Sequence, residues 1–145
     1  MESPFTDLSD REYAKLLAFR AGLRRFLRWS EERAAEVGLT ATQHQLLLAI
    51  RGHAGLRGPT IGELAGYLCT RHHSTVQLID RVEQLGLVVR NRGEGEDRRV
   101  VRLALTEAGE RKLALLSATH LEELQRLAPL VAAFAGSVAA VAHVP

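Results

Sequence analysis

The sequence predicts a mainly α-helical fold with one small β-hairpin. Near both ends of the chain, apolar residues recur at three- and four-residue steps, the period of an amphipathic helix. Two shorter helical patterns lie between these long stretches. Residues 87–105 instead alternate apolar and polar side chains around a turn with two glycines, which is typical of paired strands.

The first half of the chain is predicted to hold two helices. The first runs from Ser9 to Gly38, with an apolar stripe formed by Leu16, Phe19, Leu23 and Phe26. Thr40 is expected to cap a second helix that ends near a cluster of glycines and a proline. Its core residues are expected to be Leu46, Leu47 and Ile50.

Two short helices and a turn are predicted for residues 60–86. Thr60 and Glu63 form a capping-box pattern, in which each side chain satisfies a free backbone donor of the other residue. The helix that follows should break around Cys69. A second helix then runs from about Arg71 to Leu85 and stops at Gly86. Its packed side is expected to hold Leu78, Ile79, Val82 and Leu85.

The strand-like segments 87–92 and 99–105 flank a turn at residues 93–96, so they predict a β-hairpin. Thr106 and Glu107 open another long helix. Its apolar stripe is expected to hold Leu113, Leu116, Leu124 and Leu127. Pro129 should separate this helix from a final apolar helix, since proline disrupts a helix interior.

The composition fits one compact domain over residues 1–145. Apolar residues make up 46% of the chain and charged residues 25%, as in ordinary globular proteins. Almost all the bases are arginine, because Lys15 and Lys112 are the only lysines. This bias suits an anionic partner, but GC-rich codon usage produces it equally well, so both explanations stay open. Residues 71–102 hold seven arginines against five carboxylates, a net charge of +2.

The single cysteine and the first residues favour a cytoplasmic protein without a membrane partner. Cys69 has no second cysteine with which to form an internal disulfide, and it is expected to be a small buried residue. No basic region followed by an apolar run opens the chain. The histidines lack metal-ligand spacing, so neither a metal nor a cofactor is predicted.

The order helix, turn, helix, hairpin is that of a winged helix-turn-helix. In such a unit the second helix enters the major groove of duplex DNA, where arginine can pair with guanine and glutamine with adenine. The side chains that point outward from the 71–85 helix suit such contacts, and they are Arg71, His72, His73, Ser74, Gln77 and Arg81. At the hairpin tip, Arg98 and Arg99 are candidates for the minor groove. Asp97 is assigned a wing-stabilising role, as a partner for Arg99 or Arg81.

The segment 61–110 resembles the MarR family of transcriptional regulators. The most specific part is Asp97-Arg98-Arg99 followed by Leu103, Leu105 and Thr106, which follows the family's D-x-R-x-x-x-L-x-L-T wing pattern. The resemblance implies a homodimer on a pseudo-palindromic operator, with dimerisation helices at 9–38 and 107–145 and a DNA-binding region at 40–106. It also implies a small-molecule effector of lipophilic or phenolic character, with Trp29 and His44 as pocket candidates. Ordinary packing explains those two residues at least as well.

Two other classes of function compete with DNA binding. Enzymatic activity is not expected, because the sequence has no glycine-rich phosphate loop, no paired catalytic carboxylates and no nucleophile elbow. The alternative is a winged helix used as a protein-interaction module without sequence-specific DNA readout. Salt dependence separates the two, since binding through several phosphates weakens steeply with ionic strength.

Overall fold

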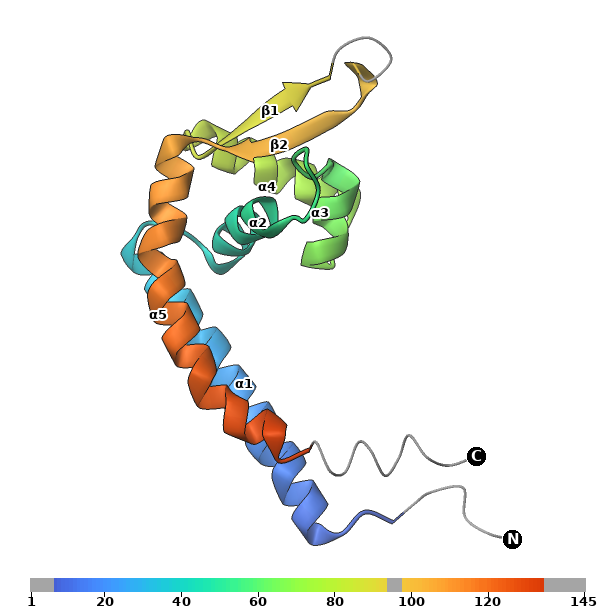
Figure 1. The fold of residues 1–145 in the computed structure, drawn as a ribbon, viewed down its shortest axis with the longest axis vertical. Coiled ribbons are helices and arrows are strands. Elements are labelled where there is room, and N and C mark those ends of the chain that lie inside the picture. Colours follow the sequence, from blue (N-terminus) through green and yellow to red (C-terminus); the bar gives the residue numbers. More distant parts are fainter. Residues whose placement is uncertain (1–6, 94–97, 135–145) are drawn as a thin grey trace, which may run out of the picture. The chain divides into compact units, whose positions relative to one another are not determined.

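The structure is a computed structural model, and it describes residues 7–93 and 98–134. Within those residues the elements follow the predicted order (Figure 1), so the predicted fold class is confirmed. They are α1 (Asp10–Glu36), α2 (Ala41–Gly52), α3 (Ile61–Leu68), α4 (His72–Gln84), β1 (Val88–Arg92), β2 (Val101–Leu105) and α5 (Glu107–Ala132).

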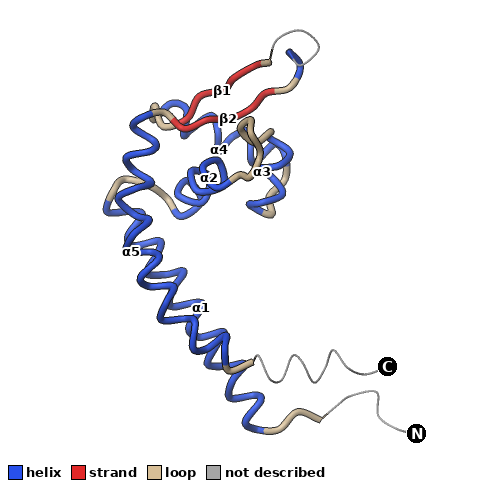
Figure 2. The backbone as a smooth tube through the Cα atoms, in the orientation of Figure 1, coloured by secondary structure: helices blue, strands red, loops and turns tan. Residues whose placement is uncertain are grey.

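The chain divides into two compact units. One holds residues 1–30 and 119–145, and the other holds residues 31–118. The first unit pairs the beginning of α1 with the end of α5, which run side by side (Figure 2). Gly22 faces α5 in this pairing, because a Cβ atom there would lie 2.6 Å from the end of the Leu130 side chain. Phe19 meets Phe134 edge to face, with ring centroids 5.9 Å apart.

The second unit packs α2, α3 and α4 against one another and against the hairpin. Its core excludes solvent, since the largest side chains at its centre are fully buried: Leu46, Leu47, Leu64, Ile79 and Leu103. They come from α2, α3, α4 and β2, so each of these elements contributes one apolar side to a single core. Burial of such side chains is the main stabilising term for a unit of this kind.

The start of α3 is held by a cap that differs from its prediction. Thr60 accepts a hydrogen bond from the Glu63 amide at 3.2 Å, as expected. The predicted return bond from the Thr60 amide to the Glu63 carboxylate is wrong: that carboxylate accepts from the Thr60 hydroxyl instead, at 3.2 Å. A full capping box occurs at the start of α2, where Thr40 and Gln43 bond each other in both directions.

A tight turn joins α3 to α4. Cys69 ends α3 with a φ of 52°, in the left-handed region that glycine usually occupies. Cys69 is exposed, so its predicted burial is wrong. After α4, Gly86 adopts a φ of 75° and stops the helix, as predicted. Leu85 was expected on the packed side but is 54% exposed, because it lies at the C-cap, where the helical path ends.

The hairpin pairs β1 and β2 in an antiparallel register that sets Val88 opposite Leu105 and Arg92 opposite Val101. The segment before α3 joins β2 as well, through a bridge between Thr60 and Arg102. This approach is close at Gly58, where a Cβ atom would lie 2.0 Å from the carbonyl oxygen of Leu103. Glycine is therefore required at this position.

Thr106 fixes the start of α5 to the end of α4. Its hydroxyl donates to the Gly86 carbonyl at 2.6 Å and accepts from the Gly109 amide at 3.1 Å. Its own amide donates to the Leu87 carbonyl at 3.0 Å. One side chain and its peptide thus tie the base of the hairpin to the first turn of α5.

The predicted break at Pro129 is wrong. Helix α5 continues through this residue to Ala132, and the Pro129 carbonyl still accepts the amide of Ala133 at 3.1 Å. Proline removes its own N–H donor but leaves its carbonyl able to bond the next turn. Most of the final apolar helix predicted from residue 130 lies outside the described residues. None of the helices in the described ranges is both long and apolar enough to cross a membrane.

Candidate nucleic-acid interface

Helix α4 presents a polar row to solvent. All six residues predicted to point outward are exposed, including the N-cap residue Arg71: Arg71, His72, His73, Ser74, Gln77 and Arg81. The opposite side is closed, since Thr75, Ile79 and Val82 have no exposed surface. One turn of helix takes 3.6 residues, so this alternation separates a packed stripe from an accessible one. The accessible stripe carries hydrogen-bond donors and acceptors.

Thr75 anchors the packed side of α4 by polar contacts. Its hydroxyl lies 2.8 Å from that of Thr70 and donates to the Arg71 carbonyl at 3.0 Å. A buried hydroxyl is costly without such partners. These bonds fix the turn that precedes α4, and with it the start of the polar row. The sequence did not predict this role for Thr75.

An arginine of the hairpin joins α4 and was not predicted as a site residue. Arg90 donates to Asp80 at 2.6 Å and to Glu83 at 2.8 Å. The hydrogen bond to Asp80 is the main cause that raises the pKa of Arg90, and the charge of Glu83 adds to it. Both acids of α4 are thereby paired with a positive charge. The negative charge of these two acids, which lie beside the polar row, is therefore partly offset toward an anionic partner.

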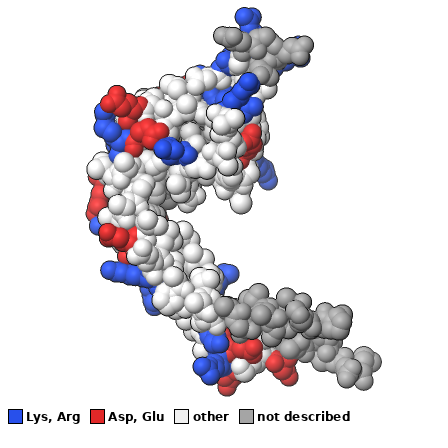
Figure 3. Space-filling view, viewed as in Figure 1, with Lys and Arg blue, Asp and Glu red and all other residues white. Residues whose placement is uncertain are grey.

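The hairpin tip supplies further arginines. Arg98 and Arg99 are both exposed, in a short helical turn that precedes β2. Figure 3 shows Lys and Arg side chains over the hairpin, next to the residues drawn in grey. Asp97, the predicted wing-stabilising residue, lies outside the described residues together with Glu94 and Glu96.

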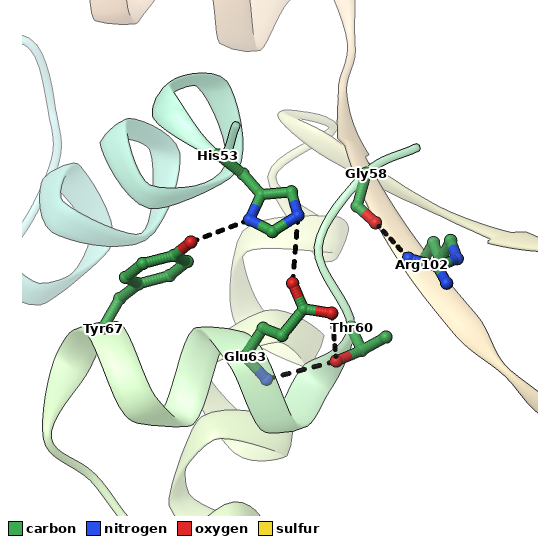
Figure 4. A network of polar contacts seen from close by, with 6 residues as sticks. All are labelled: His53, Gly58, Thr60, Glu63, Tyr67 and Arg102. Atoms are coloured by element: carbon green, nitrogen blue, oxygen red, sulfur yellow. Dashed lines mark hydrogen bonds and ion pairs between the residues drawn. The ribbon is translucent and has the colours of Figure 1, made fainter. Parts of the chain in front are cut away.

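A polar network links the end of α2 with α3 (Figure 4). The His53 ring lies 2.8 Å from the Tyr67 hydroxyl through Nδ1 and 3.0 Å from the Glu63 carboxylate through Nε2. The Glu63 side chain also bonds Thr60. These contacts fix the start of α3, and Arg102 holds the neighbouring loop by donating to the Gly58 carbonyl at 3.0 Å. The helix that braces α4 is thus held at its first turn.

The two predicted pocket residues occupy different units and are described separately. In the first unit the Trp29 ring stacks at a tilt on His120, with centroids 4.8 Å apart, while Ser30 bonds that histidine at 2.6 Å. In the second unit His44 is buried, with 6% of its surface exposed. Neither residue lines one of the cavities found among residues 45–110. Within the described ranges, no three metal-ligating side chains come together to hold an ion.

A braced helix with an exposed polar row, followed by a hairpin with basic residues at its tip, defines a winged helix-turn-helix. Residues 37–100 match the model of the MarR family, so the family predicted from the wing pattern is confirmed over this part of the chain. The matched span contains α2, α3, β1 and α4, and α4 is the helix with the exposed polar row.

Several solved structures are similar to this fold over most of the chain. A transcriptional repressor, CouR, bound to a 23-mer DNA duplex is 28% identical, with a TM-score of 0.65 over 95% of this chain and all of that one. A MarR family protein from Bacillus stearothermophilus is 27% identical, with a TM-score of 0.69 over 83% and 82% of the two chains. AbsC, a MarR family transcriptional regulator from Streptomyces coelicolor, shares the fold at 21% identity and a TM-score of 0.70, over 94% and 98%. No curated protein matches the sequence.

Proposed function

We propose that this chain is a sequence-specific transcription regulator that binds duplex DNA as a homodimer on a pseudo-palindromic operator. The observation that carries the proposal is the exposed row of α4, which offers arginine, glutamine, serine and histidine side chains while the opposite side is buried. These are the side chains that read base edges in the major groove. The similarity to a repressor solved with a DNA duplex supports the same role.

The proposal gives each exposed residue a contact. Arg71, Arg81 and Gln77 meet base edges, since arginine pairs with guanine and glutamine with adenine. His72, His73 and Ser74 meet bases or phosphates at the start of α4. Arg98 and Arg99 enter the adjacent minor groove, where the negative potential is concentrated. Asp97 holds the wing in one shape. No catalytic step is part of this function.

The apolar residues left exposed on α1 and α5 support a homodimer. Leu17 is 70% exposed and Leu121 is 63% exposed, and both belong to the first unit. Further exposed apolar side chains on these two helices are Tyr13, Leu16, Leu27, Leu124 and Val131. Soluble monomers rarely expose so many apolar side chains on neighbouring helices. The proposal makes 9–38 and 107–145 the dimerisation helices of one domain over 1–145, and 40–106 its DNA-binding region.

Repression, and release of the DNA by a small lipophilic or phenolic ligand, are the finer parts of the proposal. They rest on the resemblance to the family. Trp29 and His44 stay the pocket candidates, because a partly buried aromatic ring and a buried imidazole suit a phenolic compound.

Recovery of genomic fragments by the purified protein tests the proposed function. Fragments that share an inverted repeat, bound with two chains per duplex, would support it. The salt dependence of binding to one recovered duplex then excludes a protein-interaction module: the logarithm of the binding constant should fall linearly with that of the salt concentration. Failure to enrich any sequence over random duplex would contradict the proposal. Arg111→Gln serves as a control, because Arg111 pairs with Glu107 on α5, away from the proposed contacts.

A further inference from the structure

A groove beside the hairpin is lined by arginine and takes no part in the proposed base contacts. It encloses about 440 Å³ between the 57–58 loop and the two strands. Its polar lining comes from Arg57, Asn91, Arg92 and Arg102, and its apolar lining from Val100, Leu103 and Ala104. None of the residues found to line it in the described ranges is acidic.

The walls of this groove are fixed by close backbone packing. A guanidinium N–H of Arg102 donates to the Gly58 carbonyl at 3.0 Å, which sets the direction of the arginine side chain (Figure 4). Gly58 packs on the Leu103 carbonyl so tightly that no Cβ atom fits, and the Leu103 amide donates to Pro59 at 2.9 Å. The loop therefore cannot move away from β2 without losing these contacts. A guanidinium has five N–H donors, so Arg102 keeps others for a ligand.

From this arrangement we infer that the groove binds a phosphate group. Two guanidinium groups, those of Arg92 and Arg102, and the Asn91 amide line one concave surface, and arginine donors match phosphate oxygens in pairs. Gly58 and Gly93 carry no side chains that would obstruct an oxyanion. The phosphate has two candidate sources: the backbone of a duplex held by α4, or a free phosphate ester. Both sources present the same phosphate oxygens to the groove, and the two arms of the experiment below distinguish them.

The first arm of the experiment uses inorganic phosphate alone. It is titrated into the isotope-labelled protein at constant ionic strength, and the amide signals of Asn91, Gly93 and Arg102 are followed by NMR. A free ester as the natural ligand predicts saturable shifts at these residues. Arg92→Gln should weaken that binding roughly tenfold, the usual effect of losing one charge-assisted contact. Arg92 is exposed, so its replacement leaves the core intact. Arg111→Gln is the matched control and should bind phosphate like the parent.

The second arm measures the salt dependence of duplex binding by the same variants. If a backbone phosphate occupies the groove, Arg92→Gln should make the plot of log binding constant against log salt concentration less steep. The slope should change by about 0.9, the value for one phosphate contact. An unchanged slope, with saturable phosphate binding that Arg92→Gln weakens, assigns the groove to a free ester. An unchanged slope with no saturable binding, or with binding that Arg92→Gln does not alter, overturns the inference. Should no duplex bind at all, the proposed function fails and the first arm alone decides.

Discussion

Arg90 of the hairpin and Asp80 of helix α4 are joined by a hydrogen bond of 2.6 Å between Nη2 and Oδ1. The second guanidinium nitrogen of Arg90 bonds Glu83, one helical turn further along. The strand that leads to the wing is thus attached to the helix that carries the proposed base contacts. This attachment acts on both stability and charge, because it sets one positive charge against two carboxylates next to the polar row.

Arg90→Gln is expected to destabilise the protein by about 1 kcal/mol, since it removes a charge-assisted pair that is only partly exposed. Urea unfolding measures the change. Arg111→Gln removes an ion pair of 2.8 Å whose arginine is 68% exposed, and it should cost less than about 0.5 kcal/mol. Equal losses for the two variants would show that the bonds of Arg90 add nothing beyond an ordinary surface pair.

Gly109→Ala is expected to destabilise the protein by roughly 1–3 kcal/mol, the usual range for forcing an atom into a packed site. A Cβ atom there would lie 2.1 Å from the carbonyl oxygen of Leu87, and backbone cannot shift as a side chain can. Thermal unfolding measures the loss. Gly66→Ala is the control, since nothing lies within 4 Å of its Cβ position in α3. Alanine is the better helix former, so this variant should gain up to about 1 kcal/mol. A stable Gly109→Ala would contradict the close approach of α5 to the end of α4.

Arg99→Ala is expected to lower operator affinity without unfolding the dimer, because Arg99 is exposed near the hairpin tip. Loss of one charged contact should also make the fall of log binding constant with log salt concentration less steep, by about 0.9. Fluorescence anisotropy with a labelled operator, at several salt concentrations, measures both quantities. An unchanged binding curve would reject the contact proposed for Arg99. An unchanged unfolding curve is the control for folding.

Gln77→Ala is expected to relax base preference at one position in each half-site by about 1–3 kcal/mol, the value of a good base contact. Gln77 is exposed on α4 and has no structural role in the core. Selection from a random duplex library compares the preferred sequences of parent and variant. If both select the same consensus with the same stringency, Gln77 does not read a base.

Periodic features were the ones that the sequence predicted well. The exposed and buried sides of α4 follow the 3.6-residue repeat, so the six outward residues and the packed Ile79 and Val82 were all predicted correctly. The hairpin was equally clear, because its alternation has a period of two. These patterns depend on local geometry alone, and the structure reproduces them.

Features that depend on contacts between elements were missed. Arg90 pairs with Asp80 and Glu83 across a helix end and a turn, and nothing in its spacing indicates that geometry. Leu85 was assigned to the packed side by the helical repeat and Cys69 by residue type, yet both stand at helix ends, where the backbone leaves the helical path. The arginine groove is made from the 57–58 loop and the two strands, which only the folded chain brings together.

The three hydrogen bonds of Thr106 have a mechanical consequence within the 31–118 unit. They join the carbonyls of Gly86 and Leu87, just after α4, to the first turn of α5 through a single residue. If α5 turned about its own axis near this residue, either those bonds would break or the end of α4 would be dragged with it. As long as those bonds hold, twisting of α5 at this junction also displaces the helix that carries the polar row.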